Sequence, residues 1–456
     1  MKTSHHKNYE IDMCNGPLFG KILLFPLPLM LSGILQLLFN AADVVVVGRF
    51  AGNESLAAVG STGALTNLLV NLFVGLSVGA NVLVARYYGA KAEEEVSQTV
   101  HTSILISVLG GVVLAVLGIV LARPLLHMMD TPENVIGHSV LYMRIYFLGM
   151  PVMLLFNFGS AILRAVGDTR RPLFYLMIAG VINVCLNLGF VIVFHMGVAG
   201  VALATVISQC VSTALILRCL AFSEGCFRLH LDKLRINYDK LGKIAAIGLP
   251  AGVQGSLFSI SNVLIQSSVN SFGSVAMAGN TAGANVEGFV YTAMNSVHQT
   301  AVSFTGQNLG GKRYDRINKI LIECVLFVTV IGLVMGNGAY LLGRQILSLY
   351  SPDQEVILYG IQRMSIICTF YCLCGIMDVL VGSIRGLGYA VMPMIVSLLG
   401  ACVFRVIWVC TVFQWDRTLH TLYVSYPVSW ALTAFVHFLC FIVVKRKIGE
   451  SGKVTV

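Results

Sequence analysis

The chain has 456 residues, of which 57% are hydrophobic and only 11% charged, and its mean hydropathy is +0.82. An average soluble protein carries about 25% charged residues, so a soluble fold of this size could not bury so much apolar surface. The formal net charge of +9 would point to an anionic partner such as nucleic acid only if the basic residues formed a patch.

Apolar windows of about 20 residues, the length that crosses a bilayer, recur along almost the whole chain and predict an all-α membrane protein. The first window has no cleavage pattern and is too long for a signal peptide, so we expect a retained span. The twelve predicted transmembrane helices are 22–47, 56–85, 100–122, 138–163, 173–194, 199–221, 248–272, 277–305, 318–342, 356–384, 393–413 and 424–444.

The basic residues between these spans fall on alternate sides of the membrane. If the N-terminus is cytoplasmic, most Lys and Arg residues lie inside, and the outside segments hold only Arg49, Arg123, Arg344 and Arg417. This asymmetry follows the positive-inside rule. It predicts a multi-pass protein of the cell membrane (plasma or inner membrane) with both termini cytoplasmic, and it explains the net charge without nucleic acid.

The second half of the chain also matches the first half in a single register. In this register the segment Arg164–Pro172 falls on Arg385–Pro393, so that arginine, glycine and proline recur at equivalent positions. Each unit holds six spans, an even number, which predicts two homologous six-helix bundles in a parallel repeat. We expect an N-terminal lobe at 1–221, a cytoplasmic linker at 222–243 and a C-terminal lobe with a short cytoplasmic tail at 244–456.

An ionisable residue inside a span is costly and indicates function by default. Asp43 in the first span has no cation within five residues on either side. A desolvated carboxylate can take up a proton or bind a small cation together with neutral oxygens. The alternative is an outer-end carboxylate that faces water, since Gly48 and Arg49 follow closely.

Oxygen-bearing side chains in the fifth and sixth spans could complete a cation site with Asp43. Asn183 and Asn187 are four residues apart and so share one helix face, and Thr205 follows in the next span. Their counterparts in the second unit of the repeat are apolar or aromatic: Phe404, Trp408 and Tyr426. This predicts a cation site, for Na⁺ or H⁺, in the first lobe and an apolar substrate wall in the second, unless the asparagines merely bond across helices.

Two further intramembrane carboxylates are candidates for the substrate cavity. Asp378 aligns with Asn157 in the repeat, so this pair could line a central cavity from both lobes, and Glu287 could do the same. The alternative for each carboxylate is an ion pair with an internal arginine, Arg363 or Arg405.

No motif indicates an enzyme. Gly306–Lys312 has the spacing of a phosphate loop, but Arg313 replaces the required serine or threonine, and a membrane span precedes it. The histidines and cysteines show no metal-binding spacing, and the sequence shows no catalytic grouping of Ser, Cys or Asp with His. We therefore expect no cofactor beyond the coupling ion.

Several segments resemble the multidrug and toxic compound extrusion (MATE) family: Pro26–Gln36 continuing to Asp43 and Leu56–Thr62, Gly248–Gly252, Gly306–Asn308, and the paired Arg-x-x-Gly turns at Arg164 and Arg385. The resemblance implies a V-shaped pair of bundles that exchanges external Na⁺ or H⁺ for a cytoplasmic, often cationic and apolar drug. It places cation coupling at Asp43, Asn183, Asn187 and Thr205, and helix bending at Pro26. Some members carry a seventh-span carboxylate, but Gln254–Gln266 contains none.

The resulting hypothesis is multidrug antiport by a monomer whose partners are small-molecule drugs and membrane lipids. A lipid-linked saccharide flippase of the same superfamily is the alternative, because Arg144, Arg363 and Arg405 could bind a pyrophosphate head group. A polytopic membrane enzyme is the third class.

Overall fold

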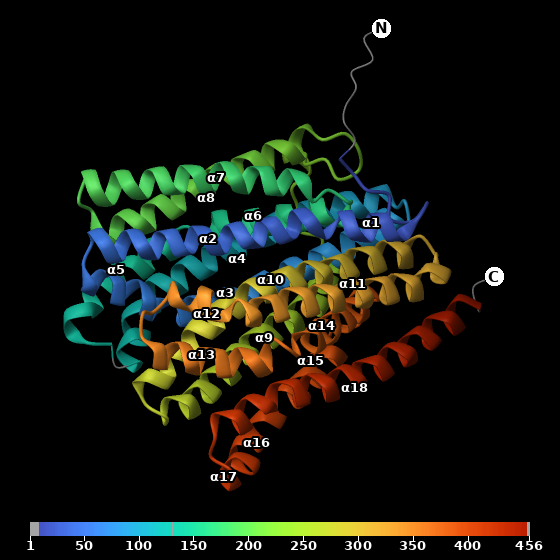
Figure 1. Ribbon diagram of the computed structural model, residues 1–456. Coiled ribbons are helices and arrows are strands. Elements are labelled where there is room, and N and C mark those ends of the chain that lie inside the picture. The colour runs from blue at the N-terminus through green and yellow to red at the C-terminus, as the bar shows by residue number, and fades with distance from the viewer. Residues whose placement is uncertain (1–8, 130, 454–456) are drawn as a thin grey trace.

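The protein is entirely helical in the computed structural model, which describes residues 9–129 and 131–453 (Figure 1). This confirms the predicted all-α class. The elements are, in chain order, α1 (Leu18–Leu24), α2 (Pro26–Phe50), α3 (Asn53–Gly89), α4 (Glu93–Met128), α5 (Glu133–Leu148), α6 (Met150–Ala165), α7 (Arg170–Leu188), the π-helical turn η1 (Gly189–Val193), α8 (Gly197–Phe222), the 3-10 turn η2 (Leu231–Lys233), α9 (Tyr238–Asn270), α10 (Ser274–Gly310), α11 (Tyr314–Leu341), α12 (Gly343–Ser348), α13 (Gln354–Ile367), α14 (Tyr371–Gly386), α15 (Val391–Ser397), the π-helical turn η3 (Leu398–Val403), α16 (Phe404–Cys410), α17 (Val412–Trp415) and α18 (Leu419–Lys453).

Most of these helices are membrane spans. Within the described residues, nine segments are long and apolar enough to cross a membrane, and the count rises to 11 when each of two bent helix pairs is taken as one span. The pairs are α5 with α6, bent by 47°, and α13 with α14, bent by 50°. The remaining predicted span, 277–305, is α10, which has 37 residues but is too polar to enter that count. Several of its polar side chains nevertheless face protein, since Asn280, Glu287 and His298 are buried.

The predicted repeat is present in the backbone. Helices α3 and α10 begin at equivalent positions of the repeat, Asn53 and Ser274, and each has 37 residues. Lys91 and Lys312, which follow these helices in the same register, share an unusual left-handed backbone with φ of 55°. The bends of α5–α6 and α13–α14 also correspond. The division into 1–221, 222–243 and 244–456 stays a prediction, and α9 already begins inside the predicted linker.

The helices of the two halves lie side by side, the first half above the second in Figure 1, with α3 packed against α9 and α10. Glycines allow this approach: a β-carbon at Gly79 would overlap the carbonyl oxygen of Ile244, and one at Gly310 would overlap that of Arg86. A β-carbon at Gly311, the next residue after Gly310, would lie 3.2 Å from the sulfur of Cys14, so this contact lies at the end of the bundle that holds the segment before α1. The two halves therefore meet backbone to backbone at that end.

The segment before α1 is inserted between the halves at the same end. The Ile11 amide donates to the carbonyl oxygen of Gly167 in the first half, at 3.2 Å. The carbonyl oxygen of Met13 accepts from the Asn308 amide of the second half, at 3.0 Å. The Met13 side chain is fully buried. The N-terminal segment, residues 9–16, thus bridges the two halves.

Candidate functional site

A polar cluster inside the first half joins three helices. Asp43 lies on α2, Asn183 and Asn187 on α7, and Thr205 on α8. The Asn187 side-chain amide donates to Asp43 Oδ1, and the Thr205 hydroxyl lies 3.4 Å from Asp43 Oδ2. The Asn187 amide also lies 3.2 Å from Asn183 Oδ1. The structure therefore brings together all four residues that the sequence marks as a cation site.

Local packing explains why these side chains converge. Asn183 and Asn187 are one helical turn apart and are 5% and 1% exposed, so their face of α7 points into the bundle. Gly180, one turn earlier, lies against the ring of Phe39, where any β-carbon would overlap it. This close contact holds α7 against α2, the helix that carries Asp43.

The cluster can hold a small cation or a proton. Within the described residues Asp43 makes no ion pair, and its oxygens contact only the amide of Asn187 and the hydroxyl of Thr205. The side-chain oxygen of Asn187 is buried without a hydrogen-bond partner. Carboxylate, amide and hydroxyl oxygens suit Na⁺, and the same groups can hydrogen-bond a protonated acid. The asparagines do form hydrogen bonds across helices, as the alternative proposed, but these bonds also include the carboxylate of Asp43.

A cavity of about 560 Å³ lies inside the second half. Residues of α9, α10, α13, α14, α16 and α18 line it, together with Asn71 of α3 from the first half. They include Glu287, Asp378, Tyr426 and the two internal arginines, Arg363 and Arg405. Glu287 is held by Arg363 through two contacts of 2.8 and 2.6 Å. Of the two roles considered for Glu287, the structure therefore shows the ion pair with an internal arginine.

Asp378 differs from Glu287. Its Oδ2 atom is buried without a hydrogen-bond partner, and it forms no ion pair with any described residue. Arg405 donates to the hydroxyl of Ser429 at 2.9 Å, and its guanidinium lies 4.2 Å from the ring centroid of Tyr426. A cation–π contact thus stabilises its charge. Asp378 is thus the carboxylate of this cavity that remains available to a ligand.

The predicted apolar wall does not form one surface. Tyr426 lines this cavity, but Phe404 and Trp408 lie outside its lining and outside that of the second cavity, which is described next. Their rings contact each other along α16 in a tilted arrangement, with centroids 5.8 Å apart and planes at 42°. The Trp408 indole donates to the carbonyl oxygen of Thr421 at 3.0 Å. Sequence register placed these residues in the correct helix but not on the cavity face.

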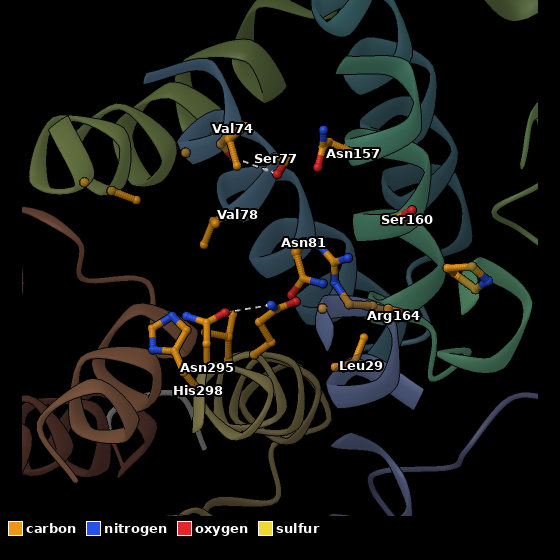
Figure 2. A pocket seen from close by; sticks show the side chains of 18 of the residues that line it. Leu29, Val74, Ser77, Val78, Asn81, Asn157, Ser160, Arg164, Asn295 and His298 are labelled. Carbon is orange, nitrogen blue, oxygen red and sulfur yellow. Dashed lines mark hydrogen bonds between the residues drawn. The ribbon is translucent and has the colours of Figure 1, made fainter. Parts of the chain in front are cut away.

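A second cavity, of about 350 Å³, lies between the halves. Asn157 lines this cavity rather than the one that holds Asp378. In Figure 2 the side chains of Arg164 and Asn81 reach it from α6 and α3, and those of Asn295 and His298 from α10. Arg385 of α14 lines it too. The sequence predicted a central cavity lined from both lobes, with Asn157 in it, but it did not assign Arg164 or Arg385 to that cavity, although the repeat had aligned these two arginines.

Two other predicted residues lie away from these sites. Pro26 is buried at the first residue of α2, directly after the break from α1, and its role in helix bending stays a prediction. Arg144 is exposed on α5, where its guanidinium lies 3.4 Å from the carbonyl oxygen of Ile119. Of the three arginines considered for a pyrophosphate head group, only Arg363 and Arg405 therefore reach a cavity.

Comparison with known proteins identifies the family. The MatE family matches residues 28–189 and 250–410, one stretch in each half. The chain belongs to the MATE family. It is similar to the probable multidrug resistance protein YoeA of Bacillus subtilis, with 30% identity over 407 residues, 87% of this chain and 88% of that protein. It is also similar to an FAD transporter of Shewanella oneidensis, with 25% identity over 351 residues, 74% of this chain and 76% of that protein.

Solved structures show the same fold. A MOP superfamily transporter from Pyrococcus furiosus superimposes with a TM-score of 0.90 at 21% identity, covering 96% of this chain and 98% of that one. The chain is therefore a multi-pass multidrug efflux transporter of the MATE family, not an enzyme.

Proposed function

We propose that this MATE transporter is a secondary active antiporter, which exports a cationic and apolar drug in exchange for Na⁺ or H⁺ bound at Asp43. The observation that carries the proposal is the isolated carboxylate: Asp43 contacts only neutral donors, Asn187 and Thr205. A buried carboxylate that lacks a counter-charge gains most from binding a cation.

The energetics suit one coupled cation. One positive charge that moves inward gains about 2.3 kcal/mol per 100 mV of membrane potential. That free energy sustains a drug gradient of roughly fifty-fold, at about 1.4 kcal/mol per tenfold. The direction assumes that both termini are cytoplasmic, as the basic residues predict.

The drug would bind in the second-half cavity. Its aromatic wall, which includes Tyr371, Tyr426 and Trp430, suits an apolar body. Asp378 supplies a carboxylate for a positive group, because Glu287 is already neutralised by Arg363. Cation binding at Asp43 in the other half would shift the arrangement of the halves and release the drug.

The test is efflux of a fluorescent organic cation from proteoliposomes under an imposed Na⁺ or H⁺ gradient, comparing the wild type with Asp43→Asn. We expect gradient-driven export in the wild type and its loss in Asp43→Asn. Glu54→Gln is the matched control, since Glu54 is an exposed carboxylate at the start of α3. Export that persists in Asp43→Asn would overturn the proposal, and the gradient that drives the wild type identifies the coupling ion.

A further inference from the structure

The inter-half cavity carries positive charge without a counter-charge in its lining. Arg164 and Arg385 both line it, and its lining contains no aspartate or glutamate. The two arginines occupy equivalent positions of the repeat, so each half contributes the same residue to one shared cavity. A cationic drug would be repelled here, and a group of the opposite sign would be attracted.

The guanidinium donors of this pair are available. Arg164 makes no hydrogen bond or ion pair with any described residue. Arg385 is 6% exposed, and it donates to the side-chain oxygen of Gln254 at 2.8 Å. The Nε atom of Arg385 is buried without a partner. A guanidinium has only donors, and leaving a buried donor unpaired costs free energy that a bound acceptor would recover.

The nearest carboxylates do not neutralise the pair. Asp378 lies on α14 two turns before Arg385, and its charge acts on Arg385. It forms no ion pair with any described residue, however, and it lines the other cavity. Asp168, close to Arg164 in the chain, instead forms an ion pair with Arg171. The charge of the two arginines is therefore not neutralised by an ion pair within the described residues.

We propose that the inter-half cavity binds an anionic group of the substrate, a carboxylate or a phosphate ester, through Arg164 and Arg385. Arginine matches both groups because its planar fork donates two parallel hydrogen bonds. The volume of about 350 Å³ lies within the range of small-ligand pockets, roughly 300 to 1,000 Å³.

The two cavities are continuous in their lining, since Asn71 and Gly255 belong to both. A substrate that carries both charges could thus place its positive group at Asp378 and its negative group at the arginine pair. This inference adds a substrate class to the proposed antiport and rests on it for the direction of transport. Binding of the anion does not depend on antiport.

The experiment measures binding without any gradient. Full-length protein in nanodiscs of zwitterionic lipid is titrated calorimetrically with phenyl phosphate, benzoate and phenyltrimethylammonium, which share a ring and differ in charge. The variants are Arg164→Gln, Arg385→Gln and Arg164→Lys, and Arg144→Gln is the control because it removes an exposed arginine outside both cavities.

We expect each Gln variant to raise the Kd of the anions relative to that of the cation by at least about tenfold, as for one lost hydrogen bond to a charged group. Arg164→Lys should recover part of the loss, and Arg144→Gln should show none. Arg164 has no internal partner among the described residues, so its variants test the site even if Arg385→Gln fails to fold. Equal Kd ratios in all variants, or no anion binding to the wild type, would overturn the proposal.

A second set of nanodiscs that contain anionic phospholipid identifies the source of the anion. If the affinity for phenyl phosphate is lower in the anionic than in the zwitterionic nanodiscs for the wild type, but not for Arg164→Gln, the site takes a lipid phosphate. If this affinity is unchanged, the site takes a soluble organic anion. Anion binding in a protein that shows no gradient-driven export would refute the antiport and leave this site standing.

Discussion

Asp43 and Glu287 are both carboxylates inside membrane spans, and their neighbours give them different roles. Glu287 faces a guanidinium at 2.6 Å, so its charge is neutralised within the protein. Asp43 faces an amide and a hydroxyl, which orient the carboxylate without neutralising it. Only a carboxylate of the second kind can exchange its counter-ion during a transport cycle.

The ion pair of Glu287 and Arg363 should be a structural contact. Glu287→Gln leaves Arg363 buried as an uncompensated cation, which costs about 3 to 5 kcal/mol in a protein interior. We expect a clearly lower unfolding temperature in detergent for Glu287→Gln, measured by intrinsic fluorescence. The double variant Glu287→Gln, Arg363→Gln should regain part of the loss, because it removes the unpaired charge. Equal unfolding temperatures in the wild type and the single variant would contradict this role.

Sequence spacing predicted the convergence of side chains around Asp43 better than it predicted a shared surface for Phe404, Trp408 and Tyr426. Asn183 and Asn187 lie on an uninterrupted stretch of α7, so a separation of four residues fixes their shared face. Phe404, the counterpart of Asn183, follows directly after the π-helical turn η3. A π-helical turn widens the helix and rotates the residues after it. The repeat register could therefore identify the helix position of Phe404 but not the direction in which its side chain points.

At the scale of elements, the bends inside two spans were not predictable from hydropathy. Windows 138–163 and 356–384 each appear continuous, yet each consists of two helices bent by 47° and 50°. In the first half Pro151 lies in the first turn of α6 and gives a local reason for the break. The second half bends at the equivalent place without a proline. Packing against neighbouring helices must therefore set that bend. These contacts are long-range, so a local window of the sequence does not reveal them.

The N-terminal segment should hold the two halves together at its end of the bundle. Met13 is fully buried between them, and truncation of a buried methionine to alanine costs about 2 to 5 kcal/mol. If this free energy is lost only from the state in which the two halves are in contact at this end, Met13→Ala should raise the population of the separated state more than tenfold. We expect faster maleimide labelling of the adjacent Cys14, followed by mass spectrometry of its peptide.

The control for this experiment is Phe19→Ala, which shortens a side chain on α1 that is 65% exposed. Labelling of Cys14 should keep the wild-type rate in Phe19→Ala. Equal labelling rates in Met13→Ala and the wild type would show that the N-terminal segment does not restrain the halves.

At the scale of the whole molecule, the sequence supports the number of spans and the repeat but not the contact between the halves. Lipid-facing and partner-facing helix surfaces are both apolar, so hydropathy cannot distinguish them. The contact depends instead on small residues: a β-carbon at Gly306 would lie 3.2 Å from that of Ala85, which connects α10 of one half to α3 of the other. Only the three-dimensional arrangement pairs these two positions.

An antiporter that works by moving its halves must separate them at this contact in one of its states. A disulfide between Ala85→Cys and Gly306→Cys would prevent that separation. Disulfides need β-carbons about 3.5 to 4.5 Å apart, which a small adjustment of the 3.2 Å spacing provides. Because Cys14 lies near Gln307 and could compete, the variant should also carry Cys14→Ser.

We expect oxidation to stop export of a fluorescent substrate from proteoliposomes and reduction of the same sample to restore it. Each single cysteine variant, oxidised in parallel, controls for damage by the oxidant and for the substitution itself. The formation of the bond is checked by mass spectrometry of the joined peptides. If the cross-linked protein still exports its substrate at the rate of the reduced protein, the halves do not part at this end. The substrate would then have to reach the central cavities by a motion within one half.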